Sequence, residues 1–122
     1  GRLLGEGWER FMAGIDDRRV EVTARAVRDL LADCLVTLPA LLDRDAGTSL
    51  HFWFGTLSPL RRSLFPRALA AREAWLSGRG TACLREAVVS GRRHWLDVAR
   101  TLAADAGEAG RMALDPSRAA LA

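Results

Sequence analysis

The hydrophobic residues between positions 17 and 38 recur at alternating steps of four and three. This spacing places them on one side of an α-helix and leaves charged side chains on its other faces. The stripe consists of Val20, Ala24, Val27, Leu31, Cys34 and Leu38. Asp16 or Asp17 is a suitable N-cap, because a short carboxylate accepts hydrogen bonds from the first free amides. The pattern predicts a long amphipathic helix over about 17–38, which Pro39 should kink or end.

A second stripe of the same kind predicts another long amphipathic helix, over about 81–104. Its members are Leu84, Val88, Gly91, Trp95, Val98 and Leu102. Gly91 stands in the middle of this stripe, although a glycine inside a helix costs about 1 kcal/mol relative to alanine. We therefore expect close packing at Gly91, against another helix or a large ring such as Trp53 or Trp75. A ligand filling the same gap is the alternative.

Shorter helices are predicted around these two. Proline is tolerated at the first helical position, so Pro59 and Pro66 each indicate a helix start. The helix that begins at Pro66 is expected to reach about residue 76. A further helix over residues 3–14 would carry on one side Leu4, Trp8, Phe11 and Met12.

Strand signals are nearly absent, since Ile occurs once, Tyr never, and no Asn-Gly or Asp-Gly turn is present. The length of 122 residues is that of one domain. Past Leu102 the chain is rich in Ala and Gly, with one last turn starting at Asp115 and Pro116, and from about residue 105 it is expected to be loosely ordered. The sequence predicts an all-α single domain over residues 1–122, a bundle of five or six helices.

Positive charge is concentrated in one third of the chain. All 18 basic side chains are arginines and the sequence has no Lys, a skew typical of GC-rich bacterial genomes. The region 58–93 has a net charge of +6, whereas residues 1–57 carry −2 and residues 94–122 carry −1. This asymmetry favours an acidic partner or an anionic ligand.

The segment 49–62 combines aromatic side chains with positive charge. A short helix that Gly55 ends would direct Trp53 and Phe54 to one side and His51 towards the other. In a structural interpretation these rings plug the end of the bundle. In a functional interpretation they line a pocket or an apolar partner surface, because ligand pockets are mostly apolar with a few polar groups.

Two arginines extend this candidate site. Arg61 and Arg62 fall in the first turn of the helix that begins at Pro59, where the helix dipole disfavours cations and favours an anion. A bound carboxylate, a phosphate or an acidic partner would offset this unfavourable placement. The predicted ligand-binding residues are His51, Trp53, Phe54, Arg61, Arg62, Trp75 and His94.

The cysteines and histidines form no known catalytic or metal motif. Cys34 lies in the first stripe, where a buried free thiol is expected, and a disulfide to Cys83 would require an oxidising compartment. Cys83 and His94 share one flank of the second long helix, but they are eleven residues apart, about 16 Å along the axis. We therefore expect no enzymatic activity, no metal and no cofactor.

The sequence favours a non-enzymatic helical module with a regulatory or dimerising role. It would bind a small molecule, anionic and amphipathic, or an acidic protein partner. The four Trp residues and the many arginines are of the types enriched at interface hot spots. A nucleic-acid-binding protein that uses the arginines of 58–93 is the alternative, a small helical enzyme ranks third, and a homodimer stays open.

We expect no membrane partner and a cytoplasmic location. No apolar run approaches the roughly 20 residues that a membrane-spanning helix needs. The first residues lack the basic, apolar and small-residue succession of a signal peptide.

Val27→Asp or Leu31→Asp is predicted to unfold the domain, because either change places an uncompensated charge in the apolar stripe of the first long helix. Circular dichroism during heating tests this prediction. A cooperative transition near the wild-type temperature would remove the core assignment of that stripe.

Overall fold

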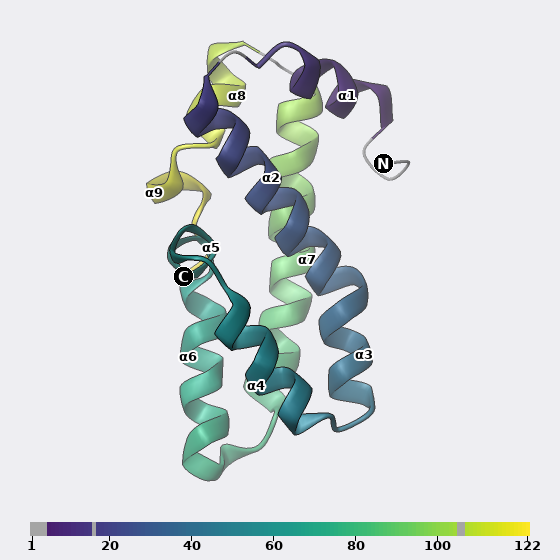
Figure 1. Ribbon diagram of the computed structural model, residues 1–122, viewed down its shortest axis with the longest axis vertical. Helices are drawn as coiled ribbons and strands as arrows, with labels where there is room; N and C mark the ends of the chain where they lie inside the picture. Colours follow the sequence, from purple (N-terminus) through teal and green to yellow (C-terminus); the bar gives the residue numbers. More distant parts are fainter. Residues whose placement is uncertain (1–4, 16, 105–106) are drawn as a thin grey trace.

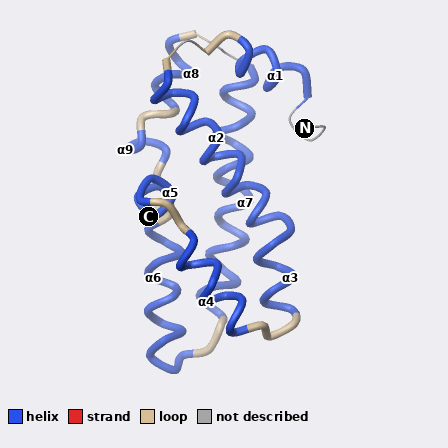
Figure 2. Tube along the Cα trace, in the orientation of Figure 1, coloured by secondary structure: helices blue, strands red, loops and turns tan. Residues whose placement is uncertain are grey.

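The computed structural model describes residues 5–15, 17–104 and 107–122. Every regular element in these ranges is helical, which confirms the predicted all-α class (Figure 2). The helices are α1 (Gly5–Ala13), α2 (Arg18–Ala32), α3 (Leu38–Asp43), α4 (Gly47–Thr56), α5 (Pro59–Leu64), α6 (Pro66–Ala74), α7 (Ala82–Ala104), α8 (Glu108–Ala113) and α9 (Pro116–Ala119). Two π-helical turns, η1 (Asp33–Thr37) and η2 (Trp75–Arg79), follow α2 and α6 directly.

The first long helix starts as predicted and continues past its predicted end. Asp17 is the N-cap, with its Oδ1 accepting the amide of Arg19 at 2.8 Å, whereas Asp16 lies outside the described residues. Pro39 does not end the helix. In an α-helix a proline ring clashes with the carbonyl four residues before it. Here the turn before Pro39 is the wider π-helical turn η1, in which the Leu38 amide donates to the Asp33 carbonyl. The π-helical turn thus admits the ring, and the helix runs on as α3.

Helix α7 is the centre of the bundle (Figure 1). It contacts α1, α2, α3, α6 and α8, and its buried face follows the predicted stripe, with Ala99 fully buried beside the half-buried Val98. Helix α1 buries Trp8 and Phe11, while Leu4 lies outside the described residues. Within the described ranges neither α7 nor any other helix has the length and hydropathy needed to cross a membrane.

The predicted close packing at Gly91 is confirmed. A Cβ atom built on Gly91 would lie 2.7 Å from Cys34 Sγ and 2.8 Å from Phe65 Cζ, closer than side chains approach one another. The ring at this position is Phe65, which stands edge-on to Trp95 with centroids 5.7 Å apart. The expectation of Trp53 or Trp75 as this ring was wrong, because the corner between α5 and α6 brings Phe65 there instead.

The chain after α7 folds back along the bundle (Figure 1). Helix α9 begins at the predicted turn, where Asp115 accepts the amide of Ser117 at 3.0 Å. The amide of Leu121 donates to the carbonyl of Leu64 at 2.8 Å. Residues 107–122 form two short helices, of which α8 was not predicted, and these helices pack against α5 and α7.

Gly91→Ala is predicted to lower the free energy of unfolding by up to about 2 kcal/mol. The alanine gains about 1 kcal/mol of helix propensity, but its Cβ overpacks the contact with Cys34 and Phe65, which costs roughly 1–3 kcal/mol. The matched control is Gly55→Ala in α4, where a Cβ meets nothing within 4 Å. This control should be neutral or stabilising by up to about 1 kcal/mol.

Urea unfolding of both variants measures these changes. Adding Cys34→Ala to Gly91→Ala removes one of the two colliding atoms, so the costs of the two changes should not add. A Gly91→Ala variant as stable as Gly55→Ala would contradict the proposed close contact.

Candidate functional site

The seven residues predicted to bind a ligand do not line one common cavity. Trp53 and Phe54 are 7% and 2% exposed, and their rings pack edge to face with centroids 4.9 Å apart. The space between them and α7 is apolar and about 10 Å³ in volume, the size of a single water molecule. Their burial supports the structural interpretation, in which these rings plug the end of the bundle.

His51 and Trp75 form a separate pair. Their rings stack with centroids 4.3 Å apart and an angle of 24° between the planes. His51 is exposed on α4, and Trp75 is half-buried at the start of η2. The pair therefore joins α4 to η2 at the surface, whereas Trp53 is buried in the core.

Arg61 finds its counter-charge within the protein. Its Nη2 donates to the carbonyl of Thr56 at 3.1 Å, and its Nη1 lies 3.9 Å from Asp33 Oδ2. Burial raises the pKa of the Asp33 carboxyl, while a hydrogen bond from Trp53 and the charge of Arg61 lower it in part. The anion expected beside this helix start is thus already supplied for Arg61 by Asp33, whereas Arg62 is exposed.

His94 anchors the C-terminal segment. Its Nε2 hydrogen-bonds to the carbonyl oxygen of Ala119, which requires a proton on that nitrogen, and its ring packs edge-on against Trp95 with centroids 4.6 Å apart. Arg67 holds the same segment, because its amide bonds to the Leu121 carbonyl at 2.9 Å. These contacts fix α9 beside α5 and α7.

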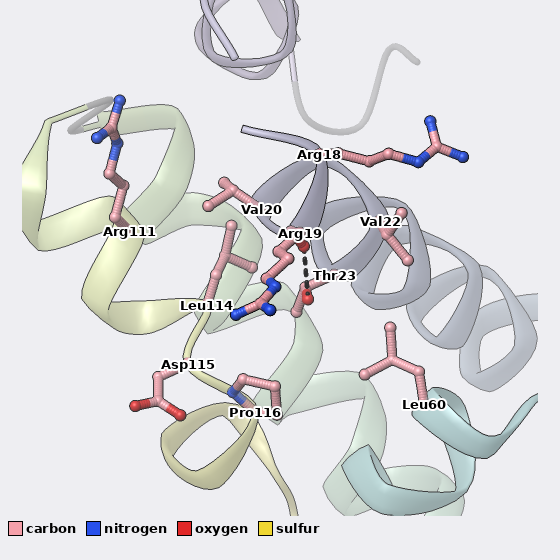
Figure 3. A pocket seen from close by; sticks show the side chains of 10 residues that line it. All are labelled: Arg18, Arg19, Val20, Val22, Thr23, Leu60, Arg111, Leu114, Asp115 and Pro116. Carbon is pink, nitrogen blue, oxygen red and sulfur yellow. Dashed lines mark hydrogen bonds between the residues drawn. The ribbon is translucent and has the colours of Figure 1, made fainter. Parts of the chain in front are cut away.

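A groove of about 810 Å³ lies between the start of α2, helix α5 and the turn that joins α8 to α9 (Figure 3). We call it the α2–α9 groove. Its apolar lining is Val20, Val22, Leu60, Leu114 and Pro116, and its polar lining is Arg18, Arg19, Thr23, Arg111 and Asp115.

The polar side chains of the α2–α9 groove leave its floor apolar. The Thr23 hydroxyl donates to the Arg19 carbonyl at 3.0 Å, so it has its partner within α2. The Asp115 carboxylate accepts from both the amide and the hydroxyl of Ser117, which lowers the pKa of Asp115. Figure 3 shows the side chain of Arg19 reaching across the groove, while Arg18 points outward at its rim.

A second hollow of about 340 Å³ continues the α2–α9 groove along α2. The two share Val22 and Leu60. The second hollow adds to the lining Arg25, Ala26, Asp29, Ser58, Pro59 and Arg61. Val22, at the junction, is 43% exposed, which is unusual for a large apolar side chain on this helix.

The sequence analysis missed the α2–α9 groove for a definable reason. It placed Val20 in the buried stripe, and it treated the segment that carries Leu114 as loosely ordered. The available signal was Val22, an apolar side chain outside the stripe and four residues after Arg18. That signal indicates an exposed apolar position but cannot indicate which distant element lies opposite.

The two cysteine thiols lie in different environments. Burial raises the pKa of the Cys34 thiol to about 12, so it stays protonated at neutral pH. Cys34 and Cys83 are both free thiols, and Cys83 is exposed. Within the described ranges no three His, Cys, Asp or Glu side chains are grouped to hold a metal ion. The α2–α9 groove supplies apolar contact and positive charge.

Comparison with known proteins gives a family but no characterised relative. No curated protein and no solved structure matches the chain. The profile of one family, described as the C-terminal domain of a family of unknown function (DUF6866), matches residues 1–121. The chain therefore belongs to the DUF6866 family and constitutes its C-terminal domain.

Proposed function

We propose that this domain is a non-enzymatic binding module that holds an anionic amphipathic ligand in the α2–α9 groove. One observation carries the proposal: the groove combines an apolar floor with the side chains of Arg18 and Arg19. The apolar part of the ligand would pack on Val22, Leu60 and Leu114. Its anionic group would pair with Arg18 or Arg19, neither of which has a salt-bridge partner among the described residues.

The two kinds of contact have different roles. Burying apolar surface contributes about 25 cal/mol per Å², so the floor of the groove supplies most of the affinity. An exposed ion pair contributes only about 0–1 kcal/mol, so the arginines mainly orient the ligand and speed its approach. Binding should therefore weaken only moderately as salt concentration rises.

The competing hypothesis, binding of nucleic acid by the arginines of 58–93, has less support. Contacts within the protein engage four of these eight arginines, on the three helices α5, α6 and α7: Arg61, Arg67, Arg72 and Arg85. Arg92 and Arg93 are exposed on α7 and remain the best candidates for phosphate contacts. A binding mode based on phosphate contacts would show a steep dependence on salt.

The groove lining also supports binding over catalysis. Thr23 is bonded to its own helix and Asp115 is bonded to Ser117. Neither side chain has a neighbouring base that would activate it as a nucleophile. The arrangement holds a ligand and provides no group poised to attack it.

The double change Arg18→Ala, Arg19→Ala is predicted to weaken the binding of dodecanoate about 2- to 5-fold, the loss of roughly one exposed ion pair. Val22→Asp should weaken it further, because a carboxylate then stands in the apolar wall. Isothermal titration calorimetry below the micellar concentration measures both effects.

The matched controls are Arg92→Ala, Arg93→Ala and Val89→Asp, since these residues are exposed on α7 and outside the groove. They should bind dodecanoate as wild type does. Equal binding by Val22→Asp and Val89→Asp would overturn the proposed site, and so would a loss confined to the Arg92, Arg93 variant, which would place the anion on α7.

A further inference from the structure

The α2–α9 groove and the second hollow adjoin along α2, where Val22 and Leu60 line both of them. We call the two hollows together the trough. The α2 residues that line the trough run from Arg18 to Asp29, a span of twelve residues, or about 16 Å from the first to the last at the standard helical rise. This length equals about three turns of a second helix.

One face of α2 is exposed to the trough at helical spacing. Arg18, Val22, Arg25 and Asp29 follow one another at steps of four, three and four. The same spacing describes the contact face of a helix that packs against another helix or in a groove. On the opposite wall, Leu60 and Pro59 of α5 provide apolar contacts along the same line.

The charges of the trough are positive and uneven. Five arginines and two aspartates line it, and Arg25 and Arg61 are already paired with Glu21 and Asp33 at 3.0 and 3.9 Å. Arg18 and Arg19, which form no salt bridge with any other described residue, lie at the N-terminal end of α2. The occupant therefore complements the trough best when it carries carboxylates towards that end.

The far end of the trough is too polar for a simple alkyl chain. There the lining includes Arg25, Asp29 and Ser58. An alkyl chain longer than the α2–α9 groove would have to cover these polar groups. Each group that lost its water and gained no hydrogen-bond partner would cost binding free energy. A helix with both apolar and polar side chains satisfies both ends.

From this length, spacing and charge we infer that the ligand is an acidic amphipathic helix of about three turns, supplied by a protein partner and laid along α2. The inference rests on the proposed function, because it names the occupant of the same groove. The apolar side chains of the partner helix pack between Val22 and Leu60, and its carboxylates pair with Arg18 and Arg19.

The experiment uses the full chain and a fluorescent peptide of about twelve residues, three turns, with Leu at every third or fourth position and Glu between them. A peptide of the same composition in scrambled order is the control for amphipathicity, and one with Lys in place of Glu is the control for charge. Fluorescence anisotropy should show the acidic amphipathic peptide binding at least tenfold more tightly than either control.

The variant Asp29→Arg distinguishes binding of a helix along the whole trough from binding of a short ligand in the α2–α9 groove. This exposed residue lies at the far end of the trough, so the change should tighten binding of the acidic peptide about 2- to 5-fold. It should leave dodecanoate, which is confined to the α2–α9 groove, unaffected. Val22→Asp should weaken both ligands, whereas Val89→Asp should weaken neither.

The outcomes distinguish the two proposals. If dodecanoate binds and the acidic peptide binds no better than its scrambled control, the inference of a helical ligand is overturned and the proposed groove site stands. If neither ligand binds, both proposals fall. If native mass spectrometry finds a dimer that Val22→Asp dissociates, the occupant is a second copy of this chain and the partner helix is overturned.

Discussion

The contact of Gly91 with Cys34 and Phe65 determines where the main helices of this domain lie. At this point the backbone of α7 approaches the thiol of η1 and the ring that precedes α6 more closely than a Cβ would permit. The same approach removes Cys34 from water and raises the pKa of its thiol to about 12. Leu64, the neighbour of Phe65, accepts the amide of Leu121. The groove wall formed by α9 thus depends, through this corner, on the glycine of α7.

The π-helical turn η1 links that core contact to the groove. It accommodates Pro39, and it carries Cys34 towards α7 and Asp33 towards Arg61 of α5. Burial raises the pKa of the Asp33 carboxyl, so ionising this group costs desolvation energy that Arg61 offsets only in part. The Arg61–Asp33 ion pair holds α5 against the first long helix. Leu60 of α5 thereby forms one side of the groove.

The sequence predicted which face of each helix is buried better than it predicted which helices contact one another. The two stripes and the Asp17 cap were predicted correctly because each is a local property of a helix. The tight packing at Gly91 was also foreseen, but Phe65 was not identified as its neighbour. The aromatic residues of α4 were predicted to line a site, but Trp53 is buried in the core. Composition alone does not distinguish an aromatic ring in the core from one that lines a pocket. The groove joins residues about ninety positions apart, from Val22 to Leu114, and no periodicity reports such a pairing.

The groove wall is built from elements that cannot be stable alone. Helices α8 and α9 have six and four residues, far below the roughly 12–15 residues at which an isolated helix becomes even marginal in water. Their structure therefore depends on docking, through the His94 contact with Ala119 and the main-chain bonds of Leu121. A ligand that touches Leu114 and Pro116 binds only the docked arrangement, so by linkage it must stabilise that arrangement. Occupancy of the groove and order in the C-terminal segment are consequently one equilibrium, and a partner that fills the groove also fixes the position of α9.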